Sequence, residues 1–258
     1  MLLTIDIGNT HIASGVFSDQ NLISHWRIST DLKKTEDEYA VILSNLFSMD
    51  NLDLEKVKGA IVESVVPHLT WNFKKTVNRL FHFDPLVMTH DTDIGLVNRY
   101  DNPQEVGMDR LANAVGGKAA LGAPVIIVDF GTAITLDLVD RDGAYAGGII
   151  MPGQEMSADS LFKRTSRLPR ISLIRPPRVL GASAVASMQS GLFYGTIGAV
   201  ETLIRRIWDE AGYKTKVAVT GGGAVELVKE IPLVDLFDPY LTLRGLELIW
   251  LHNSGSRI

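Results

Sequence analysis

Two short segments of this chain repeat one pattern, and the repeat limits the folds that are possible. The segments "LTIDIGNTHIASGVF" (Leu3–Phe17) and "IIVDFGTAITLDLV" (Ile126–Val139) each contain an apolar run that ends in aspartate, one further residue, glycine and then a polar side chain. The two aspartates, Asp6 and Asp129, are 123 positions apart in a chain of 258 residues. Because this spacing is close to half of the chain, we expect a duplicated domain.

The order of the predicted elements indicates an α/β fold. Each half starts with strands joined by tight turns and then mixes helices with further strands. We therefore expect each half to form a mixed sheet flanked by helices, and not a doubly wound sheet. The best division is near Gly116-Gly117, giving domains over residues 1–116 and 117–258, and the cleft between them is the natural ligand site. The predicted strands are Leu2–Ile7, Ile12–Phe17, Leu22–Ile28, Ala60–Val66, Pro85–Thr89, Pro124–Asp129, Ile134–Val139, Ala144–Ile150 and Lys216–Thr220.

Several helices are predicted between these strands. Thr35 and Glu38 have the spacing of a capping box at a helix start, and another helix should begin near Asp109. The longest helix contains an apolar stripe, for which core packing and a subunit contact are both possible: Phe193, Ile197, Val200 and Ile204. A last helix is expected at about Leu243 to Leu251.

Composition excludes several classes of protein. The formal net charge of −5 argues against a general binder of nucleic acids or anionic membranes. The chain has no cysteine, so thiolate catalysis and thiolate metal sites are excluded. No apolar run approaches the roughly 20 residues that span a bilayer, and no signal peptide is recognisable. We therefore expect a soluble protein with no membrane or nucleic-acid partner, which fits the cytoplasm.

The repeated turn is suited to binding phosphate. Glycine lets consecutive backbone N–H groups approach an anion, and threonine adds a hydroxyl donor. The alternative for a single copy is a hairpin whose aspartate caps its own backbone, but two copies make that alternative weaker. A third segment, "VAVTGGGA" (Val217–Ala224), is an apolar strand that ends in glycines before a helix. Such a turn would let a flat ring lie against the backbone, although alone it is a weak signal.

In this order the three motifs resemble the first phosphate, second phosphate and adenosine motifs of the superfamily of acetate and sugar kinases, actin and heat-shock ATPases. That resemblance implies duplicated ribonuclease-H-like domains with ATP in the cleft. Further segments resemble the type III pantothenate kinases over nearly the whole chain, among them "WRISTD" (Trp26–Asp31), "RYDNPQEVGMDRLANA" (Arg99–Ala114), "YAGGIIMPG" (Tyr145–Gly153) and "MQSGLFYG" (Met188–Gly195). The resemblance implies ATP-dependent phosphorylation of pantothenate to 4'-phosphopantothenate, the first step of coenzyme A synthesis. It also implies a homodimer, Mg²⁺ with ATP, and a monovalent cation, potassium or ammonium.

The resemblance also assigns residues to these roles. Asp109 takes the position of the catalytic base, and Asp129 takes the position that holds the monovalent cation. The ATP-binding positions fall on Asp6, Ile7, Gly8, Asn9, Thr10, His11, Ile12, Ala13, Thr132, Gly221 and Gly222. The pantothenate positions fall on Tyr100, Gly107, Met108, Asp109, Arg110 and Ala184.

Some of these assignments have alternatives. Taken alone, an aspartate before an apolar helix is most often an N-cap, so Asp109 could serve the helix instead of catalysis. Arg110 could clamp the pantothenate carboxylate or form a salt bridge with a neighbour. The family usually has Asn-Thr-Val where this chain has Ser183-Ala184-Val185, and Ala184 lacks the hydroxyl that contacts substrate. Alternative functions are a kinase of the same superfamily for another small substrate, and a non-catalytic regulatory relative.

Overall fold

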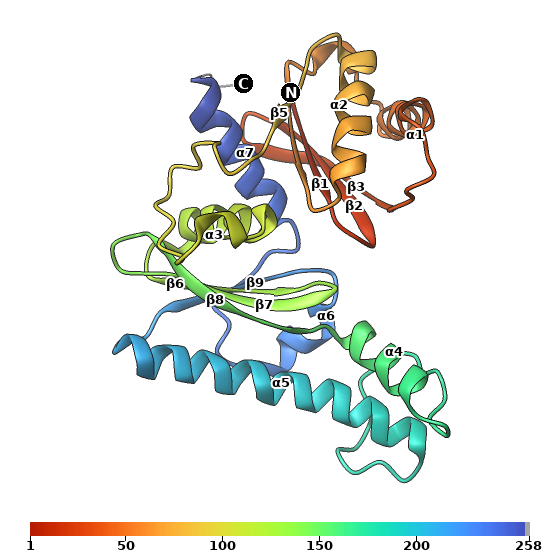
Figure 1. The fold of residues 1–258 in the computed structure, drawn as a ribbon, viewed down its shortest axis with the longest axis vertical. Coiled ribbons are helices and arrows are strands. Elements are labelled where there is room, and N and C mark those ends of the chain that lie inside the picture. Colours follow the sequence, from red (N-terminus) through yellow and green to blue (C-terminus); the bar gives the residue numbers. More distant parts are fainter. Residues whose placement is uncertain (256–258) are drawn as a thin grey trace. The chain divides into compact units, whose positions relative to one another are not determined.

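The computed structural model describes residues 1–255, which divide into two compact units, each built on a five-stranded sheet (Figure 1). Unit 1 comprises residues 1–119 together with the segment from Leu241 onward, and unit 2 comprises Ala120–Tyr240. The strand order is β3-β2-β1-β4-β5 in unit 1 and β10-β9-β6-β7-β8 in unit 2. In both units the first three strands pair antiparallel and the last two run parallel to the first. The two sheets thus have the same topology, which confirms the expected duplication.

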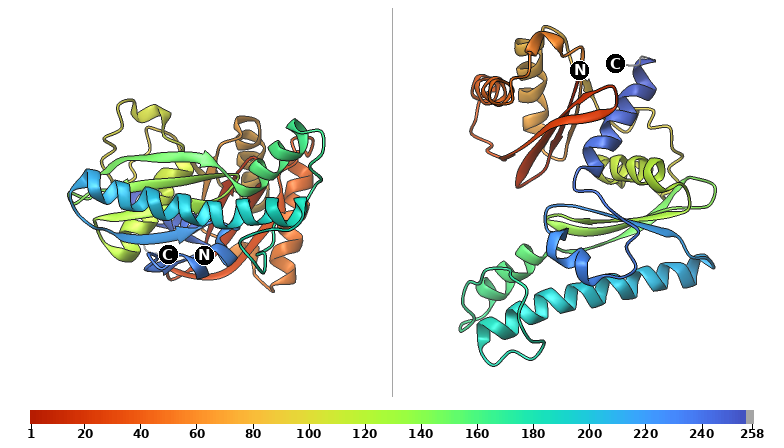
Figure 2. Two further views of the ribbon diagram at one scale, coloured as in Figure 1. Left: turned by 90° about the horizontal axis from the view of Figure 1, so that it is seen from below. Right: turned by 180° about the vertical axis from the view of Figure 1, so that it is seen from behind.

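Unit 1 has two helices on one face of its sheet and the C-terminal helix on the other, as Figures 1 and 2 show. Residues of β1, β4, α1 and α2 form its main core, which includes Ile5, Ile7, Val62, Tyr39 and Phe73. Its strands are β1 (Leu2–Ile7), β2 (His11–Ser18), β3 (Asn21–Ser29), β4 (Gly59–Ser64) and β5 (Leu86–Val87). Its helices are α1 (Glu36–Met49), α2 (Pro67–Phe81), α3 (Met108–Leu121) and α7 (Leu241–Ser254), with 3₁₀ turns at Leu54–Lys56 and Pro103–Glu105.

Unit 2 has its longest helix, α5, along one face of the sheet. The apolar stripe of this helix packs on the sheet, so core packing is the interpretation that the structure supports for Phe193, Ile197, Val200 and Ile204. The strands are β6 (Val125–Phe130), β7 (Ala133–Val139), β8 (Tyr145–Pro152), β9 (Lys216–Thr220) and β10 (Leu236–Phe237). The helices are α4 (Gln154–Arg164), α5 (Ala184–Ala211) and α6 (Ala224–Leu227), with a 3₁₀ turn at Val228–Glu230.

The capping box at the start of α1 forms as expected. The side chain of Thr35 accepts the backbone N–H of Glu38, and the Glu38 carboxylate accepts the backbone N–H of Thr35. Both bonds satisfy donors that the first turn of a helix leaves without an intrahelical partner.

The division of the chain differs from the expected one in two ways. The boundary falls after Ala119, near the end of α3, and not at Gly116-Gly117. These glycines are not a linker: a Cβ on Gly116 would lie 2.7 Å from the Leu241 carbonyl oxygen, so this glycine allows close packing against the start of α7. The segment from Leu241 belongs to unit 1 because α7 packs on β1, β4 and β2 and buries Leu246 and Ile249 there.

No helix among residues 1–255 combines the length and the apolar character that a membrane span requires.

Candidate active site

The first candidate phosphate turn is the tight connection between β1 and β2. The Gly8 N–H donates to the His11 carbonyl at 3.0 Å, and the Thr30 hydroxyl donates to the Gly8 carbonyl at 2.6 Å. These bonds fix the loop while Asn9 and Thr10 remain exposed. A Cβ on Gly8 would lie 3.1 Å from the His11 carbonyl oxygen, so a larger residue would loosen the turn. The turn therefore holds the exposed polar residues Asn9 and Thr10 at the carboxyl end of β1.

The remaining predicted residues of this loop have different surroundings. Ile7 and Ile12 are fully buried in the core beneath α1 and α2, so they hold the strand ends in place and offer only backbone groups to a ligand. Ala13 is partly buried and pairs with Asp6 across the hairpin. The Nδ1 atom of His11 lies 2.9 Å from an Arg27 guanidinium nitrogen, which orients the imidazole.

Asp6 lies beside a buried acid that the sequence did not single out, Glu63. The parallel register of β1 and β4 pairs Asp6 directly with Glu63, and paired residues of neighbouring parallel strands project from the same face of the sheet. Burial raises the pKa of Asp6 to about 6, a hydrogen bond from Glu63 opposes that rise, and the Asp109 charge adds to it. The structure thus brings Asp6, Glu63 and Asp109 into one electrostatic cluster in unit 1.

Asp109 is the second residue of α3, and its carboxylate folds back on the helix start. Its Oδ1 accepts the backbone N–H of Arg110 at 2.8 Å, and a Cβ on Gly107 would overlap this oxygen. Gly107 therefore leaves the space that the carboxylate occupies. Burial raises the pKa of Asp109, while the Arg110 N–H and the Arg110 charge lower it. Asp109 is not the N-cap residue, because the helix already begins at Met108, although it does satisfy one free N–H of the first turn.

The other predicted pantothenate residues of unit 1 lie close to Asp109 in the chain. Met108 and Arg110 are 8% and 6% exposed, so the Arg110 side chain is held within the protein and not on its surface. Tyr100 is partly buried in the irregular segment that precedes α3, and its N–H donates to the Asn98 side chain at 3.0 Å.

The second phosphate turn and the candidate adenosine turn meet in unit 2. Gly131 and Thr132 connect β6 to β7 and are exposed, and the Gly131 N–H donates to the Ala133 carbonyl at 3.1 Å. β6 and β9 run parallel in register, which pairs Asp129 with Thr220 immediately before the glycines. A Cβ on Gly221 would overlap Asp129 Oδ1, and Gly221 has a φ of +93°. The two motifs are therefore in direct contact.

A further glycine supports the second turn and was missed by the sequence analysis. The Gly153 N–H donates to the Thr132 carbonyl at 3.0 Å, and a Cβ on Gly153 would lie 2.6 Å from the Gly131 carbonyl oxygen. The segment "YAGGIIMPG" contained this residue, but only the fold shows that its backbone lies directly against Thr132.

Ala184 is distant in sequence from both turns, and it is the first residue of α5, where it is exposed.

 The Ser183 side chain caps this helix by accepting the Ala186 N–H at 3.2 Å. A methyl group at Ala184 offers a ligand no side-chain hydrogen bond.

Among the described residues, no group of three or more histidine, cysteine, aspartate or glutamate side chains is arranged to hold a metal ion. The oxygen donors at the second turn, the Asp129 carboxylate and the Thr132 hydroxyl, are of the type that hard cations prefer. They are too few to enclose an ion, so the remaining ligands would have to come from bound substrate or water.

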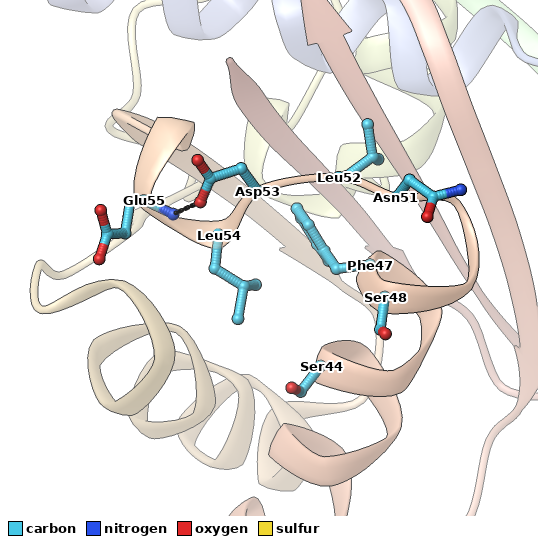
Figure 3. Close-up of a pocket in the computed structure, with 8 residues that line it drawn as sticks. All are labelled: Ser44, Phe47, Ser48, Asn51, Leu52, Asp53, Leu54 and Glu55. Carbon is cyan, nitrogen blue, oxygen red and sulfur yellow. Dashed lines mark hydrogen bonds between the residues drawn. The ribbon is translucent and has the colours of Figure 1, made fainter.

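A separate open pocket lies in unit 1, at the C-terminal end of α1 (Figure 3). It is lined by Ser44, Phe47, Ser48, Asn51, Leu52, Asp53, Leu54 and Glu55, and the Asp53 carboxylate accepts the Glu55 N–H at 3.0 Å. None of these residues belongs to the candidate site, and that hydrogen bond caps the 3₁₀ turn.

The two mixed sheets of equal topology, with turns at matching strand ends, define a duplicated α/β fold. Two solved structures share the fold. A conserved putative Baf family transcriptional activator from Campylobacter jejuni has a TM-score of 0.61 and 20% identity, covering 98% of this chain and 100% of the other. A putative 2-dehydro-3-deoxygalactonokinase from Sinorhizobium meliloti has a TM-score of 0.57 and 10% identity, covering 99% of this chain and 98% of the other. The model of the type III pantothenate kinase family matches residues 2–206. A type III pantothenate kinase from Moorella thermoacetica is 43% identical over 254 residues, covering 98% of this chain and 100% of the relative. The chain belongs to the type III pantothenate kinase family.

Proposed function

We propose that this chain transfers the γ-phosphoryl group of ATP to the primary hydroxyl of pantothenate, with Asp109 as the general base. The products are 4'-phosphopantothenate and ADP, in the first step of coenzyme A synthesis. The observation that carries the assignment of the base is the position of Asp109, a largely enclosed carboxylate in the same cluster as Asp6 of the first phosphate turn.

The reaction requires little covalent chemistry from the protein. The hydroxyl oxygen of pantothenate forms a bond to the γ-phosphorus, the bond from that phosphorus to the bridging oxygen of ADP breaks, and the hydroxyl proton passes to Asp109. Positioning and stabilisation of charge dominate such transfers. The raised pKa of Asp109 suits a group that must accept a proton, provided that the carboxylate remains ionised at the working pH.

We propose that ATP is bound by both phosphate turns and by the glycines that follow β9. Asn9 and Thr10 in the first turn, and Thr132 in the second, supply donors to the phosphates, and Gly221-Gly222 accommodate the adenosine. Support comes from the tight backbone bonds of both turns and from the contact between Gly221 and Asp129. Mg²⁺ arrives bound to ATP and neutralises phosphate charge.

We propose that pantothenate is bound by Tyr100, by Gly107 to Arg110, and by the residues around Ala184. The buried guanidinium of Arg110 is suited to the pantothenate carboxylate, because arginine forms paired hydrogen bonds with a carboxylate. Asp129 and Thr132 fit a monovalent cation, potassium or ammonium, whose charge offsets that of the phosphates. The family resemblance supports a homodimer that acts in the cytoplasm.

A coupled assay of ADP release tests this function. Purified protein with MgATP should release ADP with pantothenate and not with acetate or sugars, and potassium should increase the rate. Release of ADP with another hydroxyl or carboxylate substrate, but not with pantothenate, would reassign the substrate. Sedimentation at the assay concentration should show a dimer, and a fully active monomer would contradict the proposed assembly.

A further inference from the structure

Glu63 is a buried acid for which the proposed reaction has no use so far. It lies in β4 with 0% of its surface exposed, and among the described residues no group donates a hydrogen bond to its Oε1 or Oε2. An ionised carboxylate without partners is strongly disfavoured in a protein interior. Glu63 is therefore expected to carry a proton, which changes it from an acceptor into a donor.

The acceptor for the Glu63 proton is the carboxylate of Asp6, which is paired with Glu63 in the sheet. Asp6 and Glu63 are matched in the parallel register of β1 and β4, so their side chains project together from one face. This is the face opposite the main core, since Ile5, Ile7 and Val62 alternate with them and pack beneath α1 and α2. Two ionised carboxylates side by side repel each other, whereas one shared proton makes a hydrogen bond.

Electrostatics place the proton on Glu63. Burial, then the charges of Asp6 and Asp109, raise the pKa of Glu63 well above its ordinary value, and the nearby backbone N–H group of Asp109 opposes this rise only in part. For Asp6, the bond from Glu63 lowers the pKa. Of the two paired acids, Glu63 is thus the neutral donor, and Asp6 is the charged acceptor.

Other charged groups near β4 are engaged elsewhere. From α2, Lys74 pairs with Asp84, Lys75 with Glu36 and Arg79 with Asp37, while His68 is exposed. From α7, Arg244 acts on Glu247 and His252 pairs with Asp93. None of these residues is among the groups that shift the pKa of Glu63.

The second copy of the fold has a donor at the equivalent place. β6 and β9 correspond to β1 and β4 in the two sheets, and their register pairs Asp129 with Thr220. Thr220 is 1% exposed, so a hydroxyl group is buried beside the aspartate of the second turn. Each phosphate turn therefore has an O–H group next to its aspartate, provided that Glu63 is protonated.

We propose that Glu63 is a positioning residue: as a neutral acid it donates a hydrogen bond to the Asp6 carboxylate and links this carboxylate to the first turn of α3, which carries Asp109. The bond fixes the orientation of Asp6 beside the first phosphate turn and keeps one negative charge away from ATP. The predicted effect of this bond on ATP binding rests on the proposed function. The proton shared by Glu63 and Asp6 is inferred independently of that function.

Two variants of similar volume test the role of the proton. Glu63→Gln keeps a donor but cannot ionise, and Glu63→Met removes the donor. Glu247→Gln is the matched control, because Glu247 is a buried acid with a raised pKa that does not act on Asp6. The measurements are the KM for ATP and kcat from pH 6 to 9, ATP binding by calorimetry without pantothenate, and melting temperature over the same pH range.

In the wild type the KM for ATP should rise with increasing pH as Glu63 loses its proton. Glu63→Gln should match the wild type at the acid end of the range and lack this rise, whereas Glu63→Met should raise the KM for ATP about tenfold at every pH. Glu247→Gln should keep the wild-type profile of the KM. An unchanged rise with pH in Glu63→Gln would overturn the proposal, and so would a wild-type KM in Glu63→Met.

Failure of this inference is distinguishable from failure of the proposed function. If the wild type does not phosphorylate pantothenate, calorimetry and melting still report on Glu63. The melting temperature of the wild type should fall with rising pH more than that of Glu63→Gln, and equal slopes would contradict a buried proton on Glu63. If Glu63→Met does not fold, the comparison of Glu63→Gln with the wild type still decides the outcome.

Discussion

Gly221 lies directly against the carboxylate of Asp129, so that a side chain on the glycine would overlap Asp129 Oδ1. The same Cβ would lie 2.6 Å from the backbone nitrogen of Phe130. The glycine is also in the left-handed region, with a φ of +93°. The second phosphate turn and the candidate adenosine turn therefore constrain each other through this one residue.

Gly221→Ala should weaken ATP binding by displacing Asp129 or the glycine turn. Gly212→Ala is a matched control, because Gly212 has a φ of +75° and nothing within 4 Å of its Cβ position. Both variants should lose about 1–2 kcal/mol of stability from the left-handed backbone, but only Gly221→Ala should lose ATP affinity, by tenfold or more. Calorimetric titration with ATP and thermal melting measure both quantities. Equal ATP affinity in the two variants would contradict the contact as a determinant of binding.

Asp109→Asn should fold normally and lose turnover. Asn can still accept the Arg110 N–H, and it avoids the penalty of a buried charge, so the melting temperature should not fall. Since Asn cannot take the hydroxyl proton, kcat should fall by roughly 10²–10⁴. The control is Asp101→Asn, an exposed aspartate before α3, which should retain the wild-type rate. A folded Asp109→Asn protein with wild-type kcat would leave Asp109 only its structural role.

The acid side of the pH profile offers a second test of Asp109. Its pKa is raised above the ordinary value by burial, so the proton stays bound to a higher pH and the base is lost earlier as the pH falls. We therefore expect kcat/KM to decline on the acid side at a pH above the ordinary range of aspartate. A profile that stays flat down to about pH 4 would exclude a base with a raised pKa.

Potassium or ammonium should activate the enzyme, and sodium should do so weakly. Asp129 stands at the second phosphate turn, where its charge would repel the phosphates unless a cation offsets it. Asp129→Ala should abolish the activation. Rates should be measured with MgATP at constant ionic strength, so that general screening does not contribute. Equal rates in potassium, in sodium and without either would exclude the cation site.

Ala184→Thr should strengthen pantothenate binding and leave kcat nearly unchanged. One neutral hydrogen bond contributes roughly 0.5–1.5 kcal/mol, or about two- to tenfold in KM. The position is exposed at the first residue of α5, and the Ser183 cap should persist in the variant. Ala182→Thr, at an exposed residue before the cap, is the control. Loss of activity in Ala184→Thr would show that the pocket is arranged differently from that of the family.

The sequence predicted those parts of the fold that depend on local patterns. Alternating or continuous apolar runs predicted most strands of both sheets, and the spacing of Thr35 and Glu38 predicted the start of α1. The helix α4 was missed because none of its residues is buried, which leaves no helical apolar period to detect. The strand β10 was missed because it has only two residues.

The candidate site was predictable only in part. The aspartates and glycines of the turns stand out because their residue types repeat in a fixed order. Glu63 did not stand out, because its role depends on the register between β4 and a strand more than 50 positions earlier in the chain. Gly153 was overlooked as a support for the second turn for the same reason: its contact with Thr132 is long-range. The roles assigned to the site residues remain predictions until the variants are measured.

The return of α7 to unit 1 has a consequence for how the protein is made. Translation completes unit 2 once Tyr240 has been added, but unit 1 still lacks the helix that packs on β1 and β4. A nascent chain can therefore fold its second unit first. At that stage the strands that carry Asp6 and Glu63 still lack the packing of Leu246 and Ile249. The segment from Leu241 thus completes the support of the first phosphate turn, so that a chain cut before this segment has no finished first unit.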